Sequence, residues 1–109
     1  MEANPYFKKL KAFEAFHKAN PQVWKRFSTM ADELRAKNYR HYSHDTLISV
    51  IRFHYDIQTT GEAFKIPNEM KAFYGRMYIL KNNCPGFFTF CRMRGEPENL
   101  FLRYKKEEG

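Results

Sequence analysis

The residues best suited to chemistry or recognition lie around one short connector near the middle of the chain. It reads Asn38-Tyr39-Arg40-His41-Tyr42-Ser43-His44-Asp45 and combines basic with aromatic side chains. Arginine, histidine and tyrosine side chains commonly hold phosphates, while short polar side chains reach base edges. The connector therefore predicts contact with nucleic acid, provided that helices on either side present it.

Two helical patterns flank the connector. Apolar residues recur at helical spacing over 21–37, and Ser43 is a good N-cap for a second helix over 44–57. A helix, a turn and a second helix is typical of DNA-binding domains, with the second helix in the groove. Segment 59–66 could serve as a wing. The predicted DNA-binding residues are Arg40, His41, Tyr42, His44, Ser49, Arg52 and Lys65.

Two features of the same region weigh against this interpretation. The connector over 38–43 is longer than the three- or four-residue turn of the tight motif. The second helix is electrically neutral, whereas phosphate contacts usually require Lys or Arg. The helix-turn-helix interpretation must therefore be weighed against a metal site, an enzyme and a second nucleic-acid-binding region.

A metal site is the next alternative. His41, His44 and His54 lie within 14 residues, close to Asp45 and Asp56. However, the spacing of His41 and His44 crosses a predicted helix boundary, and no two histidines stand four residues apart on one helix face. His54 lies on the apolar face, as a core histidine would. We expect no metal site.

Enzymatic chemistry has little support in the sequence. The acidic residues are scattered, and neither a glycine-rich phosphate loop nor a serine on a strand-to-helix elbow is present. Cys84 and Cys91 are the only cysteines, and we expect free thiols in a reducing cytosol. We therefore expect a protein that is not an enzyme and takes no cofactor.

A second basic region lies in the C-terminal half. Alternating basic and aromatic residues on a strand can stack on single-stranded nucleic acid. The favoured interpretation is instead that Phe88 and Phe90 belong to the core and that the arginines form a solvated rim. The residues concerned are Lys65, Lys71, Arg76, Lys81, Arg92, Arg94, Phe88 and Phe90.

The elements that position these residues are mostly helical. Asn4-Pro5 and Asn20-Pro21 combine a capping side chain with proline at the first helical position. Apolar periodicity predicts helices over 5–18, 21–37, 44–57 and 69–81. Strand patterns over 63–66 and 87–94 predict a small two-stranded sheet. The expected fold is mainly α, with four helices and this β element, and is winged-helix-like.

Composition bounds the class of protein. The 109 residues include 19 aromatic ones and suit a single domain with one core, here expected over 1–94 with a partly mobile charged tail over 95–109. The sequence contains no run of 18 apolar residues, so it predicts no membrane-spanning helix. No apolar leader precedes the first helix either, and we therefore expect a cytoplasmic protein.

The net charge of +7 is unevenly distributed. Residues 1–38 carry eight Lys or Arg against four Asp or Glu, and residues 61–94 carry six against two, whereas 39–60 are neutral. A basic domain favours nucleic acid or an acidic protein surface as partner. The aromatic content would also suit a dimer.

Several short motifs resemble a family of small, largely uncharacterised bacteriophage and prophage proteins. They cover about 13–88 and keep their order and spacing, but Phe53-His54 replaces the family's Trp-Glu, and Pro67 its Asn. The resemblance implies a phage context and no catalytic residue. The motifs are Phe13-Glu14-Ala15-Phe16-His17, Asn20-Pro21, His41-Tyr42-Ser43, Ile51-Arg52, Phe64-Lys65-Ile66, Asn68, Tyr74 and Gly86-Phe87-Phe88.

Two functions follow as expectations. The leading one is a small phage-type protein that binds double-stranded DNA in gene control or DNA processing. The alternative is a non-enzymatic protein in the host cytoplasm that binds a host enzyme or defence complex and inhibits or redirects it.

Overall fold

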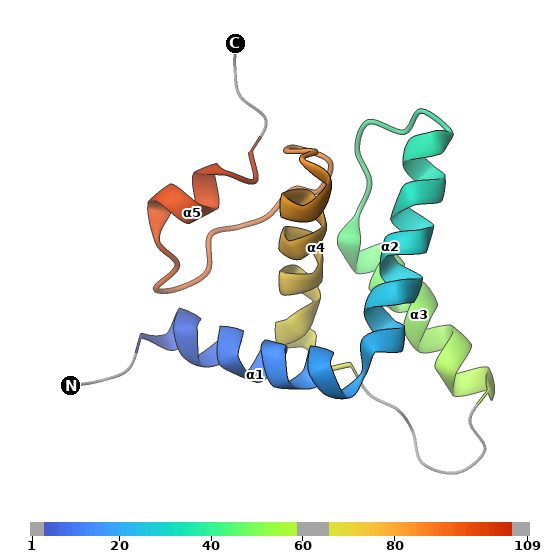
Figure 1. Ribbon diagram of the computed structural model, residues 1–109, viewed down its shortest axis with the longest axis horizontal. Coiled ribbons are helices and arrows are strands. Elements are labelled where there is room, and N and C mark those ends of the chain that lie inside the picture. The colour runs from blue at the N-terminus through green and yellow to red at the C-terminus, as the bar shows by residue number, and fades with distance from the viewer. Residues whose placement is uncertain (1–3, 59–65, 106–109) are drawn as a thin grey trace.

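The computed structural model contains five helices within the residues that it describes, 4–58 and 66–105 (Figure 1). Four of them match the predicted helices to within a residue or so at each end, and the fifth was not predicted. They are α1 (Pro5–Ala19), α2 (Pro21–Ala36), α3 (His44–Gln58), α4 (Asn68–Asn82) and α5 (Glu98–Leu102). The mainly helical class is confirmed.

Two of the three predicted N-cap side chains form capping hydrogen bonds at the start of their helices. The Asn4 side chain accepts a hydrogen bond from the Tyr6 N–H at 2.9 Å, so it caps α1. Ser43 Oγ accepts from the Thr46 N–H at 3.3 Å and caps α3 as predicted. Asn20 behaves differently, because its side-chain amide donates to the Phe16 carbonyl and satisfies the end of α1 instead of capping α2.

The core lies between α1, α2, α3 and α4 and is built largely from aromatic rings. Phe27, Tyr74, Tyr78 and Phe88 are fully buried, with neighbouring ring centroids about 6 Å apart. Ile48 and Ile51 close the α3 side of this core. Aromatic rings thus supply the volume that branched aliphatic residues supply in many domains.

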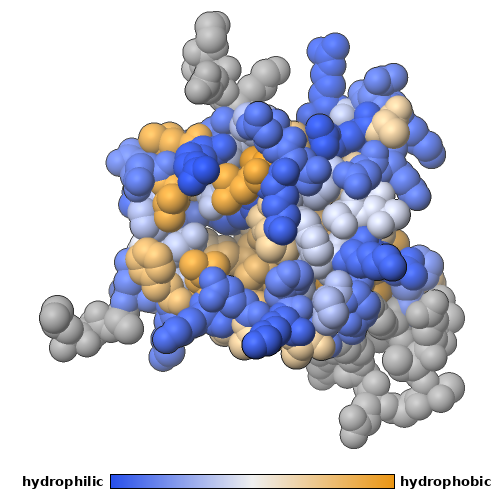
Figure 2. Space-filling view, viewed as in Figure 1, coloured by the Kyte–Doolittle hydropathy of each residue, from blue (hydrophilic) through white to orange (hydrophobic). Residues whose placement is uncertain are grey.

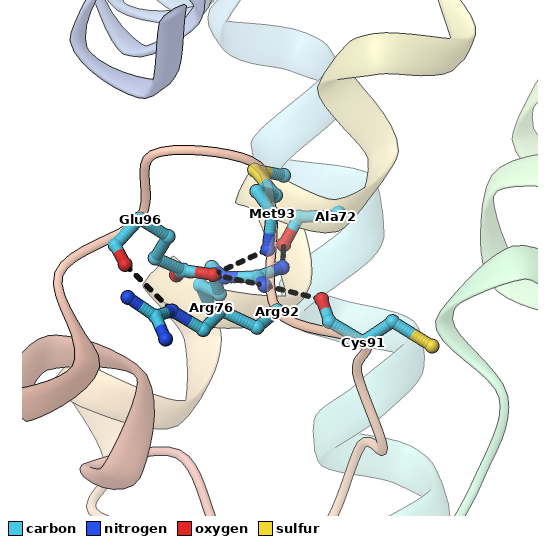
Figure 3. Close-up of polar contacts among 6 residues, drawn as sticks. All are labelled: Ala72, Arg76, Cys91, Arg92, Met93 and Glu96. Carbon is cyan, nitrogen blue, oxygen red and sulfur yellow. Dashed lines mark hydrogen bonds and ion pairs between the residues drawn. The ribbon is translucent and has the colours of Figure 1, made fainter. Parts of the chain in front are cut away.

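A buried ion pair joins α4 to the C-terminal segment. Arg76 and Glu96 are 2 % and 0 % exposed, and the Arg76 Nε and Nη2 donate to the two Glu96 carboxylate oxygens at 2.8 and 2.9 Å (Figure 3). The guanidinium also donates to the carbonyls of Ala72 and Cys91, and the carboxylate accepts from the Met93 N–H. Both charges therefore keep the polar partners that burial requires.

Aromatic rings enclose the Arg76 guanidinium. Its central carbon lies 4.5 Å from the centre of the Phe90 ring and 5.4 Å from that of Tyr104. Phe90 in turn packs on Gly75, where an ideal Cβ would come within 2.7 Å of the ring. Arg76 is thus part of the core, so its predicted place in a cationic surface or a solvated rim is wrong.

The predicted two-stranded sheet is also wrong for the part that can be compared. Residues 87–94 form turns and irregular structure, and no strand occurs in the described residues; 63–65 lie outside them. The backbone of this segment bonds to other partners: the Phe87 carbonyl accepts from the Tyr42 N–H, and the Cys91 carbonyl from Arg76. Phe87 and Phe88 are both buried, which breaks the alternation of a half-buried strand.

Residues beyond 94 pack against the helices. Phe101 and Tyr104 are about 5 % exposed, and the Gly86 N–H donates to the Tyr104 carbonyl at 2.9 Å. The Asn4 side-chain amide donates to the Gly95 carbonyl at 2.9 Å, which ties this segment to the start of α1. The buried core therefore includes Phe101 and Tyr104, which lie beyond the predicted boundary at residue 94.

A second polar link holds α2 against α4. The Tyr78 hydroxyl donates to Asp32 Oδ1 at 2.6 Å and accepts from Arg35 Nη1 at 3.4 Å. Burial and this carboxylate partner raise the pKa of Tyr78 to about 12. Burial likewise raises the pKa of Tyr104 to about 12.

The ion pair yields a stability prediction. Glu96→Gln keeps the shape of the side chain but leaves the buried Arg76 charge uncompensated, which should cost about 3–5 kcal/mol of unfolding free energy. Glu98→Gln, an exposed change two residues away, should cost less than ~0.5 kcal/mol. Urea denaturation measures both. Equal midpoints for the two variants would contradict a structural role for the pair.

The Tyr78 hydroxyl yields a prediction at alkaline pH. The unfolded chain loses this phenol proton near pH 10, whereas the folded chain holds it to about pH 12, so stability should fall as pH rises through that interval. Tyr78→Phe should make the fall shallower, with the part due to Tyr104 remaining. Denaturation midpoints at a series of alkaline pH values test this. An unchanged slope in Tyr78→Phe would refute it.

Candidate functional site

The connector places some predicted DNA-binding residues at the surface. Arg40 and His41 are exposed, and His41 Nε2 lies 2.7 Å from the Thr89 hydroxyl. Tyr42 is half-buried, and its ring meets the exposed Tyr39 ring edge-to-face at 5.8 Å. The connector is thus fastened to the C-terminal segment, and its cation, Arg40, is exposed.

Of the predicted DNA-binding residues on helix α3, two make contacts within the fold and one is exposed. His44 packs its ring against Phe90 at 4.9 Å, and burial lowers its pKa. Arg52 donates to the Ile66 carbonyl and to Asn68 Oδ1, the latter at 2.9 Å, so it fastens α3 to the start of α4. Ser49 is exposed. Lys65 lies outside the described residues. Of the six predicted residues that are described, Arg40, His41 and Ser49 are therefore exposed, whereas His44 and Arg52 are half-buried and make contacts within the fold.

The outward face of α3 is electrically poor for binding phosphate. Its first-turn carboxylate, Asp45, pairs with Lys71 at 2.7 Å, and this contact lowers the pKa of Asp45. Among residues 44–54, whose side chains are described, the other exposed residues of the helix are Thr46, Ser49, Val50 and Phe53. None of them carries a positive charge, so a DNA groove would meet no cation there.

A groove runs along the seam where α2 packs against α3. It has a main chamber of about 550 Å³ and a shallower continuation of about 170 Å³ toward the connector, and the two share Met30, Glu33 and Val50. We call this the α2–α3 groove. The main chamber is lined by Gln22, Lys25, Arg26, Thr29, Met30, Glu33, Val50 and His54. The continuation adds Leu34, Lys37, Tyr42 and Leu47.

Apolar side chains reach solvent in and beside this groove. Val50 is 36 % exposed, and Phe53, next to the lining residue His54, is 63 % exposed. The Phe53 ring lies 6.4 Å from the His54 ring. Exposed large apolar side chains at one place on a surface commonly mark a contact with another protein.

Other surface features offer less. A hollow of about 610 Å³ beside Phe7 and Leu10 is lined by α1 and its cap residue Asn4, so it has one wall. Figure 2 shows apolar residues over α5 and the segment before it, broken up by hydrophilic ones. A smaller hollow there is lined by Phe88, Phe90, Phe101 and Tyr104, which already pack on the core.

The described residues hold no cluster of side chains that could bind a metal ion. Within them, no three His, Cys, Asp or Glu side chains gather around a point where a metal ion could sit. Cys84 and Cys91 are free thiols, and burial raises the pKa of Cys84, which disfavours the reactive thiolate.

None of the helices in the described residues combines the length and the apolar character that crossing a bilayer requires.

Comparison with known proteins adds no identity to this geometry. Neither a family model, a curated protein nor a solved structure matches the chain. The resemblance to small phage proteins therefore stays a prediction.

Sequence reasoning missed Phe53 as a candidate contact residue. The available signal was the helical position: Phe53 lies three residues after Val50, on the edge that turns away from Leu47 and Ile51.

The altered role of Arg52 yields a prediction. Arg52→Ala removes the hydrogen bonds that the charged guanidinium donates to the Ile66 carbonyl and to Asn68 Oδ1. This loss should lower the free energy of unfolding by about 1–3 kcal/mol. Ser49→Ala on the exposed face should cost less than ~0.5 kcal/mol. Chemical denaturation compares them. If Arg52→Ala matched Ser49→Ala, Arg52 would be available for ligand contact.

Proposed function

We propose that this protein is a non-enzymatic protein-binding module that docks a partner in the α2–α3 groove. The observation that carries the proposal is the open groove itself, with Val50 exposed on its α3 side and Phe53 exposed beside it, next to the lining residue His54. Such side chains gain free energy when a partner removes them from water. In the phage context predicted from the sequence, the partner is a host protein that the module blocks or redirects in the host cytoplasm.

Capture from bacterial lysate tests this proposal with matched baits. Val50→Glu combined with Phe53→Glu places two charges on the apolar side of the groove, whereas Ser49→Glu adds charge to the same helix outside the lining. We expect the unaltered chain and Ser49→Glu to retain the same partner, and the double variant to lose it. Helical circular dichroism checks that all baits fold. Equal capture by all three baits would place the partner elsewhere.

Binding to double-stranded DNA is the second candidate, favoured by the net charge of +7 and by two exposed cations, Lys37 at the end of α2 and Arg40 in the connector. Lys37 and Arg40 would contact phosphates, with His41 and Tyr42 beside them. Because α3 offers no unpaired cation on its outward face, contact through the connector is the form of this function that we propose. Such binding would weaken steeply as salt rises.

Fluorescence anisotropy with labelled duplex DNA tests the second candidate. Binding at low salt should fall as salt rises, and Lys37→Glu with Arg40→Glu should abolish it, because two phosphate contacts become repulsive. The Val50 and Phe53 double variant serves as control and should bind duplex as the parent does. An absence of binding by the parent at low salt would exclude the DNA function.

A further inference from the structure

The α2–α3 groove has the length of a short helix. Its lining runs along α2 from Gln22 to Lys37, which at 1.5 Å per residue is about 22 Å, or four helical turns. Both walls are helices, and the main chamber and its continuation form one path because they share Met30, Glu33 and Val50. A straight groove between two helices accommodates a third helix more readily than a compact ligand.

The floor of the groove is apolar along this path. Met30 and Leu34 stand four residues apart on α2, and Leu47 and Val50 stand three apart on α3. An apolar stripe at spacings of three and four residues on a partner helix would lie over this floor. The site thus suits one face of an amphipathic helix.

The rim of the groove is basic. Lys25, Arg26 and Lys37 line it from α2, against one acidic residue, Glu33. Neither ion pair seen in the described residues involves any of these four side chains. The three cations therefore remain available to a partner, and the net charge of +7 would attract an acidic one from a distance.

We infer that the α2–α3 groove binds an acidic amphipathic helix of a partner protein. About four turns of that helix lie along α2 and α3, its apolar stripe covers Met30, Leu34 and Val50, and Asp or Glu residues beside the stripe pair with Lys25, Arg26 and Lys37. This inference rests on the proposed protein-binding function and adds the secondary structure and charge of the partner.

Selection from a displayed peptide library tests the inference. The library consists of helix-forming 16-residue peptides, with apolar residues varied along one stripe and Glu, Gln or Lys varied beside it. We expect clones that bind the unaltered chain to carry Glu beside the stripe. Selection on Lys25→Glu with Arg26→Glu should shift that preference toward Lys, and the original clones should bind this variant about tenfold or more weakly.

Two controls, a proline in the peptide and the Val50→Glu, Phe53→Glu variant, separate the possible failures. A proline in the middle of a selected peptide should abolish binding, because it breaks the helix. Clones that prefer Gln or Lys, or that tolerate this proline, would overturn the acidic helix while leaving the groove as a docking site. Clones that bind the Val50→Glu, Phe53→Glu variant as well as the parent, or a library without binders, would overturn the groove function too.

Discussion

The buried pair of Arg76 and Glu96 is the constraint on which the arrangement of the C-terminal half depends. Arg76 and Glu96 are 2 % and 0 % exposed. A charged side chain that is buried to this degree needs an oppositely charged partner, and its remaining polar atoms need hydrogen bonds. The pair meets that demand by drawing the Cys91 carbonyl and the Met93 N–H to itself. Because these groups bond to side chains, the segment over 87–94 has no need of a partner strand.

This constraint also decides which helix faces stay open. The segment that carries Glu96 lies against α4 on the side away from α2, and α5 follows it (Figure 1). Helix α4 thereby packs against α1, α2 and α3 and also against the C-terminal segment. The seam of α2 and α3 receives no such cover from the described residues, and the exposed apolar side chains Val50 and Phe53 remain there.

The helices could be predicted because their signals are local. Asn4-Pro5, Ser43 and the apolar stripes fixed four helices within a residue or so at each end. The strand could not be rejected from sequence, since alternation over 87–94 does not reveal that Phe87 and Phe88 are both buried. Nor could the fate of Arg76 be predicted, because its partner stands 20 residues away and the pairing depends on tertiary structure. The hydrogen bonds of Arg52 to Ile66 and Asn68 could not be predicted for the same reason.

The central claim is that the α2–α3 groove is open in the free protein. Paramagnetic relaxation by a soluble, uncharged reagent tests it directly on the isotopically labelled chain at low concentration. The account predicts strong broadening of the side-chain signals of Val50 and Phe53 and little effect on the buried Leu47 and Ile48. Protection of Val50 and Phe53 to the level of Ile48 would contradict it, because the groove would then already be covered.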